Sequence, residues 1–389
     1  MRKFFLVILP LALLWACQGN EKQTAMTELA AMTPQPVSPR HNQGVNDQVS
    51  NSRRTAITRA VERVSDAVCG INVTQMRQAR RSNHYDDPFL RFFFPERIPR
   101  QAIKSLGSGF LISSDGFILT NEHVINNASE IVVVLSDGST HNAEIVGSDY
   151  ITDIALIKIE GNNYKYIRFG DSEDVIIGEW VIALGNPFGL FEINSKPTVT
   201  VGVVSAVDRD FGRQSNDRVY QDMIQTDAAI NQGNSGGPLV NSLGEVIGMN
   251  TFIYTGSNYN TGSIGLGFAL PSNHIIRVVK DLREHGEVNR RFRTGLEVED
   301  ISPIVARYFR LGSTSGVIVT DIEKNSSAAR AGLEVRDIIM EVNGKEIRDE
   351  SDIWSVIENS DLRGGDKLNF KVLRGERILN VSMKLESVN

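Results

Sequence analysis

The sequence predicts an all-β domain of the barrel or sandwich type, followed by a smaller α+β domain. Between about residues 57 and 270, short β-rich runs alternate with turn signals. The runs "GSGFLIS" and "FILTNEHV" are separated by "SDG", and "PLVNSLGEVIGMN" folds back at Leu243 and Gly244. Many short strands of this kind are typical of barrels and sandwiches. No crossover helices separate the runs, which disfavours a parallel α/β fold.

The first 16 residues resemble a bacterial export signal. Arg2 and Lys3 precede an apolar stretch, residues 4–16, that is shorter than the roughly 20 residues of a membrane-spanning helix. The end of this stretch, "LWAC", resembles a lipobox, which implies lipidation of Cys17 and a membrane anchor. Ordinary signal cleavage is the alternative. Both interpretations predict export to the cell envelope.

Three further segments follow the signal. Residues 17–55 are polar, contain several prolines and are typical of a flexible tether. Residues 56–287 are predicted to form the first domain, which ends in a helix over "PSNHIIRVVKDLREHG" with Ser272 or Asn273 as its cap. Residues 288–389 supply more strands and two short helices, enough for a second domain.

Charge and cysteine content exclude several function classes. The formal net charge is −6 and the chain has no basic stripe, so we expect no nucleic-acid partner. Two cysteines, Cys17 and Cys69, cannot form a disulfide framework or a CxxC metal site. The chain has neither the GxxxxGK[ST] motif of ATP-driven machines nor the HExxH motif of metalloproteases. We therefore expect neither a cofactor nor a metal.

The stretch "NQGNSGGPLV" puts Ser235 between glycines on a predicted tight turn. A serine becomes a nucleophile when a base lies within hydrogen-bond reach and a third group orients that base. His123 ends a β-rich run and is the candidate base, although a histidine there could also be an ordinary turn residue. Asp153 precedes the apolar run "IALIKI" and is the candidate orienting carboxylate. Asp149 is its nearest rival, and its polar neighbours indicate an exposed turn residue.

The three segments "TNEHV", "TDIALIKI" and "GNSGGPL", in that order, resemble the trypsin-like double β-barrel serine proteases and, among them, the HtrA (Deg) family. The resemblance covers residue 57 to the C-terminus. It implies that Ser235 attacks the scissile carbonyl, His123 transfers the proton and Asp153 orients the imidazole. The backbone N–H groups of Gly233 and Ser235, with Asn234 as a further candidate, are implied to form the oxyanion hole.

The same resemblance bears on the residue that precedes the cut. Proteases of this fold that cut after Lys or Arg have an aspartate six residues before the nucleophile, where this chain has Ala229. The segment "GSIGLGFALP" resembles the family's specificity loop, with Ile264 and Leu266 narrowing the pocket. We expect a preference for Val, Ala or Ile; the alternative is that these two side chains belong to the core.

The C-terminal segment resembles a PDZ domain through "GVIVTDIEKNSSAARAGLEVRDIIMEVNGKEI". Such domains add a C-terminal peptide as an extra strand and bind its carboxylate with backbone N–H groups. The matching loop consists of Arg293, Thr294, Gly295 and Leu296. This chain departs from the family at Thr294, where an apolar residue is usual, and at Ser327, where proline is common. A purely structural PDZ domain is the alternative.

The sequence therefore predicts an ATP-independent serine endopeptidase of the bacterial cell envelope with PDZ-linked regulation. Its substrates are expected to be unfolded or misfolded proteins, or a regulatory membrane protein. Family members are trimers or multiples of trimers. One loop of this chain is rich in aromatic residues and contains Phe89, Phe92, Phe93 and Phe94. We expect these side chains to be buried either against another subunit or against the barrel of their own chain. The alternative function is a chaperone that holds unfolded chains with little or no proteolysis.

Overall fold

The structure is a computed structural model and describes residues 51–75, 103–186, 196–253 and 263–388. The chain divides into two units, Met1–Thr55 and Ala56–Asn389, and every element below belongs to the second unit. Across these described ranges, no helix is long and apolar enough to cross a membrane. The expected export signal, Cys17 and the aromatic loop from Phe89 to Phe94 lie outside the described residues.

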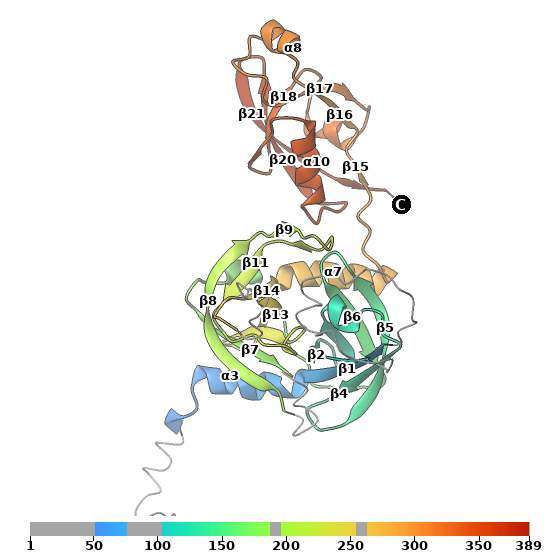
Figure 1. The fold of residues 1–389 in the computed structure, drawn as a ribbon, viewed down its shortest axis with the longest axis vertical. Coiled ribbons are helices and arrows are strands. Elements are labelled where there is room, and N and C mark those ends of the chain that lie inside the picture. Colours follow the sequence, from blue (N-terminus) through green and yellow to red (C-terminus); the bar gives the residue numbers. More distant parts are fainter. Residues whose placement is uncertain (1–50, 76–102, 187–195, 254–262, 389) are drawn as a thin grey trace, which may run out of the picture. The chain divides into compact units, whose positions relative to one another are not determined.

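The first barrel is closed and antiparallel, with the strand order β1-β2-β3-β6-β5-β4 (Figure 1). Helix α3 (Ala56–Val64) and a short 3-10 turn lead into it, and α5 (Glu122–Ile125) follows β3 directly. In the register of β3 and β6, Leu119 lies opposite Leu156, and both are fully buried. The strands are β1 (Val68–Gln75), β2 (Ile103–Leu111), β3 (Phe117–Thr120), β4 (Glu130–Val134), β5 (Thr140–Asp149) and β6 (Ile154–Ile159).

The second barrel is also closed and antiparallel, with the order β11-β14-β13-β12-β7-β8. A small hairpin, β9 (Gly212–Arg213) and β10 (Val219–Tyr220), is inserted between β8 and β11. The strands of this barrel are β7 (Trp180–Gly185), β8 (Thr198–Arg209), β11 (Met223–Thr226), β12 (Pro238–Asn241), β13 (Val246–Ile253) and β14 (Gly267–Pro271).

Helix α7 (Ser272–His285) packs against β5 and β6 of the first barrel and β13 and β14 of the second. It ends at Gly286, whose backbone N–H donates to Leu282. The predicted cap is wrong: Pro271 is the N-cap residue, and the Ser272 hydroxyl donates to the carbonyl of Gly170 instead. The side chain of Ser272 therefore fastens the helix to the segment between β6 and β7 rather than capping it.

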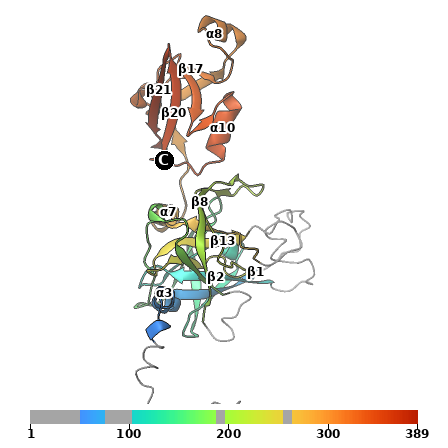
Figure 2. The same ribbon diagram turned by 90° about the vertical axis from the view of Figure 1, so that its left-hand side faces the viewer.

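The C-terminal domain has a sheet of strand order β16-β17-β18-β20-β21, and both ribbon views show α10 beside it (Figures 1 and 2). Buried Val319, Phe370 and Met383 belong to its own hydrophobic core. The sheet strands are β16 (Leu296–Asp300), β17 (Val317–Ile322), β18 (Ile338–Val342), β20 (Lys367–Arg374) and β21 (Arg377–Lys384). The remaining elements are β15 (Phe292–Arg293), α8 (Pro303–Tyr308), α9 (Ser327–Ala331), β19 (Lys345–Glu346), α10 (Glu350–Glu358) and β22 (Glu386–Ser387).

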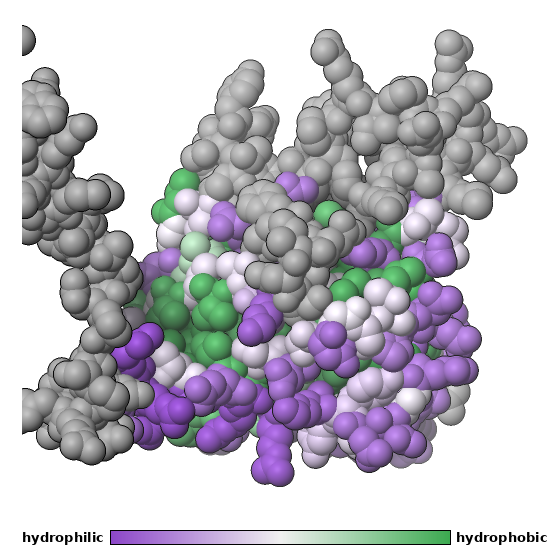
Figure 3. All heavy atoms as spheres, turned by 90° about the horizontal axis from the view of Figure 1, so that it is seen from below, coloured by the Kyte–Doolittle hydropathy of each residue, from purple (hydrophilic) through white to green (hydrophobic). Residues whose placement is uncertain are grey.

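One hydrophobic core joins the two barrels. It contains Phe110 and Leu156 from the first barrel together with Leu184 and Met249 from the second. The face of the molecule seen in Figure 3 shows areas of apolar residues, in green, that are bordered by polar residues, in purple. The predicted double β-barrel followed by a small α+β domain is confirmed.

Candidate active site

His123 lies on α5, at the point where the chain leaves β3. Since Thr120 pairs with Ala155 in the β3–β6 register, the residues that follow β3 lie beside those that precede β6. His123 Nδ1 is 2.8 Å from Asp153 Oδ2, and the backbone N–H of His123 donates to Asp153 Oδ1 at 3.0 Å. The two residues that the sequence paired are thus in direct contact, through both carboxylate oxygens.

Asp153 is fully buried and its backbone is fixed as well as its side chain. Its φ is +61°, a left-handed conformation that aspartate tolerates better than most residues. Its carbonyl accepts hydrogen bonds from the backbone N–H of Glu122 at 3.2 Å and from Asn121 Nδ2 at 2.9 Å. Burial acts to raise the pKa of Asp153, but the charge of Arg218 and then that of His123 outweigh it and lower the pKa below its ordinary value. The carboxylate is therefore ionised.

Three further polar side chains surround this aspartate, and none of them could be recognised from the sequence. Arg218 Nη1 donates to Asp153 Oδ1, and Arg218 Nη2 donates to Glu122 Oε2 at 2.6 Å. The Tyr220 hydroxyl donates to Asp153 Oδ2 at 3.3 Å. Burial raises the pKa of Glu122, and the charge of Arg218 opposes that increase. A buried cluster of three charged residues therefore lies behind the histidine.

Ser235 lies on the turn before β12, and the first barrel holds this turn in place. The backbone N–H of Ser108 donates to the carbonyl of Ser235 at 3.0 Å, and the Ser108 hydroxyl donates to the carbonyl of Gly233. Gly233 has a φ of +94° and Gly236 a φ of +83°. A Cβ atom on Gly236 would collide with the Ser108 carbonyl and the Thr120 hydroxyl. The glycines are needed for the backbone conformation and for the close approach of the two barrels.

The backbone of this turn presents two N–H groups beside the serine. In the described part of the chain, the N–H groups of Gly233 and Ser235 donate no hydrogen bond. The N–H of Asn234 differs, because it donates to the carbonyl of Asn231 at 2.9 Å within the turn. The Ser235 hydroxyl donates to the carbonyl of Thr251 at 2.9 Å. Of the three candidate oxyanion donors, only Asn234 therefore donates a hydrogen bond within the described residues.

The predicted pocket residues lie near the same turn. Ala229 is half-buried, and its carbonyl accepts hydrogen bonds from Thr200 Oγ1 at 2.8 Å and Asn234 Nδ2 at 3.5 Å. Ile264 is 47% exposed, whereas Leu266 packs against the core. The core alternative therefore fits Leu266 but not Ile264.

The predicted peptide-binding loop of the C-terminal domain leads into β16. Within the described residues, β16 pairs only with β17 and is an edge strand, and α10 contacts it. The carbonyl groups of Thr294 and Gly295 accept hydrogen bonds from Ala328 and Glu323, at 3.0 and 2.9 Å. Leu296 N–H donates to the hydroxyl of Thr294 at 3.3 Å. The loop is held by α9 and by the residue that follows β17, and among the described residues β16 offers a free edge for an added strand.

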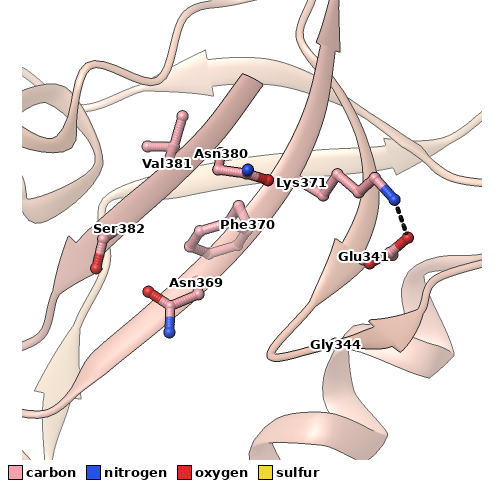
Figure 4. A pocket seen from close by; sticks show the side chains of 8 residues that line it. All are labelled: Glu341, Gly344, Asn369, Phe370, Lys371, Asn380, Val381 and Ser382. Atoms are coloured by element: carbon pink, nitrogen blue, oxygen red, sulfur yellow. Dashed lines mark hydrogen bonds and ion pairs between the residues drawn. The ribbon is translucent and has the colours of Figure 1, made fainter. Parts of the chain in front are cut away.

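A separate hollow lies on the C-terminal domain, between β18, β20 and β21. Figure 4 shows Phe370, Lys371 and Ser382 around it, with Lys371 paired to Glu341 at 2.5 Å. In strand order, β17 separates this hollow from β16. Its charged side chains, Glu341 and Lys371, are paired with each other.

Among the residues that the structure describes, no three His, Cys, Asp or Glu side chains gather closely enough to hold an ion. Cys69 is fully buried in β1, and burial raises the pKa of its thiol, as expected for a core side chain.

Comparison with known proteins agrees with this geometry. Residues 107–249 match the trypsin-like peptidase domain, and residues 286–385 match the PDZ domain. A protein of Pseudomonas putida (strain GB-1), named probable periplasmic serine endoprotease DegP-like, is 39% identical over 345 residues, or 84% of this chain and 69% of the relative. A relative of the same name from Chlamydia trachomatis (serovar D) is 40% identical over 312 residues, covering 79% of this chain and 60% of the relative.

Solved structures give the same result. The HtrA-type protease AlgW with decapeptide superposes with a TM-score of 0.56 at 35% identity, covering 86% of this chain and 99% of that one. The relatives are named endoproteases, which does not favour the chaperone alternative. The chain belongs to the HtrA family of trypsin-like serine endopeptidases and carries a PDZ domain.

Proposed function

We propose that this endopeptidase works through an acyl-enzyme on Ser235, with His123 as general base and Asp153 as the orienting carboxylate. The observation that carries the assignment is the 2.8 Å contact between His123 Nδ1 and Asp153 Oδ2. A buried, ionised aspartate on Nδ1 leaves the Nε2 atom of the imidazole to accept a proton. The glycine-backed turn at Ser235 supplies the nucleophile on the other barrel.

The mechanism begins with the Ser235 hydroxyl, which donates to the Thr251 carbonyl before substrate binds. It turns to His123, gives up its proton and attacks the scissile carbonyl carbon. The N–H groups of Gly233 and Ser235 then stabilise the oxyanion, and each such donor typically contributes about 100- to 1000-fold in rate. His123 returns the proton to the leaving amine, and water repeats the sequence to hydrolyse the acyl-enzyme.

The residue before the cut is proposed to be small or medium-sized and aliphatic, such as Val, Ala or Ile. Ala229 carries no charge that could bind a lysine or arginine side chain, and the half-exposed Ile264 supports an apolar wall. Since one methylene in a hydrophobic pocket changes discrimination by only about 10- to 200-fold, we expect a preference within this class rather than a single residue.

The substrates are proposed to be unfolded or misfolded proteins, or a regulatory membrane protein, cleaved without ATP. A C-terminal peptide is proposed to add to the edge of β16, with its carboxylate on the loop of residues 293–296. The free edge of β16 and its contact with α10 support this mode of binding. One solved relative is named with a decapeptide, which is consistent with peptide recognition in the family.

The protein is proposed to act in the bacterial periplasm as a trimer or a multiple of it, anchored by lipid on Cys17. The relatives' names support the compartment, and the "LWAC" sequence supports the lipid. Ile176, Ile177 and Trp180 are 68, 60 and 56% exposed on the segment that enters β7. Exposed large apolar side chains so close together support self-association.

A fluorophosphonate probe tests the catalytic assignment, because it phosphonylates only a serine that an assembled triad activates. We expect an adduct on Ser235, located by mass spectrometry of the purified protein, and no adduct in His123→Ala. Labelling should increase when a hydrophobic C-terminal peptide is added, if the PDZ domain regulates the site.

The variant Ser105→Ala is the matched control, since this serine lies in β2 outside the proposed triad; it should be labelled like the unmodified protein. An adduct on a different residue, or an unchanged adduct in His123→Ala, would contradict the assignment. A chaperone would instead keep its holding activity in Ser235→Ala.

A further inference from the structure

Arg218 is a charged residue whose side chain is almost entirely buried, 5% exposed. It belongs to the loop of the β9–β10 hairpin, which docks on the chain just before the catalytic aspartate. Val219 N–H donates to the carbonyl of Ile151 at 2.8 Å, and the ring of Tyr150 lies 4.5 Å from the Arg218 guanidinium. A cation in this position needs anionic partners, because an unpaired buried charge is strongly unfavourable.

The partners are two carboxylates on either side of the guanidinium. One guanidinium nitrogen donates to Asp153 Oδ1 and the other to Glu122 Oε2, at 2.6 Å. The side chains of Asp153 and Glu122 are 0 and 10% exposed. Two carboxylates this close and this buried repel each other, and the cation between them offsets that repulsion. The planar fork of arginine suits such a bridge, and lysine cannot reproduce it.

The bridge acts on the catalytic aspartate in two ways. Arg218 and the His123 backbone N–H both bind Oδ1, so Oδ2 faces the imidazole and the carboxylate cannot rotate freely. The positive charge also offsets part of the negative charge that the imidazole meets. In the described part of the chain, the titratable and charged groups around Asp153 are His123 and Glu122 from α5, and Arg218 and Tyr220 from the hairpin.

We propose that Arg218 and Glu122 are positioning residues that fix the orientation of Asp153 and set the charge it presents to His123. The proposal rests on the catalytic assignment above. It means that the β9–β10 hairpin influences how readily His123 accepts the proton of Ser235.

The test is the rate at which a fluorophosphonate probe labels Ser235 in the full-length protein, measured from pH 5 to pH 9. Arg218→Gln leaves more negative charge beside the imidazole, which favours its protonated form. The acidic limb of the profile, where the labelling rate rises with pH, should therefore move up by about 0.5 to 1 pH unit. The plateau rate, which is the labelling rate above that limb, should fall about 10- to 100-fold. Glu122→Gln removes negative charge and keeps Arg218 on Asp153, so its acidic limb should move down by about 0.5 pH unit.

Opposite shifts of the acidic limb in Arg218→Gln and Glu122→Gln would show that the two residues act through their charge, because a loss of packing alone would not move the limb in opposite directions. Arg218→Lys should restore part of the plateau rate and most of the pH profile. Arg374→Gln is the matched control, because Arg374 also forks onto buried Asp337 but lies in the C-terminal domain. It should lower the free energy of unfolding and leave the acidic limb unmoved.

The proposal is overturned if both variants keep the acidic limb of the unmodified protein, if both move it in the same direction, or if Arg374→Gln moves it too. Should Arg218→Gln fail to fold, Glu122→Gln decides the question, because an acidic limb that stays in place or moves up in that variant overturns the proposal. If the unmodified protein is never labelled on Ser235, the catalytic assignment fails instead.

Discussion

The two barrels contribute to the site by different means. The first barrel supplies the side chains of His123 and Asp153, and Asp153 accepts hydrogen bonds from Nδ1 and from the backbone N–H of His123. The hairpin inserted between β8 and β11 adds Arg218 and Tyr220, which also bind Asp153. The second barrel supplies backbone: Ser235 lies on a turn whose shape depends on Gly233 and Gly236. The side-chain half of the site, around His123 and Asp153, therefore depends on charge. The backbone half, around Ser235, depends on the conformation of the turn.

This difference teaches where each half is vulnerable. A change that keeps the shape of the first barrel but removes a charge should disable proton transfer and leave the fold intact. A change that keeps every charge but adds one methyl group to the turn should displace the nucleophile and its N–H donors. The predictions below separate these two effects.

Asp153→Asn tests the side-chain half and should have the largest effect. The amide has nearly the shape of the carboxylate but lacks its charge and binds the wrong tautomer of His123. We expect the rate of cleavage of an unfolded protein substrate to fall about 10⁴-fold. Gel assays and phosphonylation of Ser235 would measure it, with the circular dichroism spectrum unchanged.

Asp149→Asn is the control for that variant. Asp149 is buried and pairs with Arg290 at 2.6 to 2.7 Å, so its loss should lower the free energy of unfolding rather than the rate of the chemical step. If Asp149→Asn lost as much activity as Asp153→Asn, the distinction between the two aspartates would collapse.

Gly236→Ala tests the backbone half. The new Cβ would meet the Ser108 carbonyl and the Thr120 hydroxyl at a φ of +83°, so the turn must move. Loss of aligned oxyanion donors should reduce phosphonylation of Ser235 about 100- to 1000-fold. The pH profile of the remaining activity should keep its shape, because the charges around His123 are unchanged.

Gly178→Ala separates strain from collision. Gly178 precedes β7 in the same barrel and has a φ of +94°, but a Cβ there meets no atom within 4 Å. This variant should lose about 1 to 2 kcal/mol of unfolding free energy from the left-handed backbone alone and keep its activity. Equal activity losses in both glycine variants would show that the turn responds to stability rather than to local shape.

The sequence predicted the backbone half better than the side-chain half. The glycines around Ser235 lie within two residues of it, and a short window of sequence reveals their role, since tight turns need glycine. His123 and Asp153 could be named because each lies at the end of a β-rich run. Arg218 could not, since it is 65 residues from Asp153 and reaches it only because a hairpin inserted between β8 and β11 docks there.

The errors have the same physical origin. Asp149 was expected to be an exposed turn residue from its polar neighbours, yet it is buried because Arg290, 141 residues away, pairs with it. Ser272 was expected to cap α7 but binds the carbonyl of Gly170, 102 residues away. In each case a tertiary partner overrides a local preference, and no short window of sequence contains that partner.

Helix α7 contacts both barrels, so its stability bears on the two halves together. Burial lowers the pKa of His274 on this helix to about 4, below the usual value near 6.5 for an unfolded chain. Because the folded pKa is the lower one, this contribution to stability is complete above about pH 6.5 and is lost as the pH falls towards 4. Between pH 7 and pH 5 it should cost about 2 kcal/mol.

His274→Gln cannot titrate, so its urea midpoint should change less between pH 7 and pH 5 than that of the unmodified protein. His285→Gln is the control, since His285 lies exposed in the last turn of the same helix and should leave the pH dependence unaltered. An equal pH dependence in His274→Gln and the unmodified protein would mean that His274 reaches water in solution.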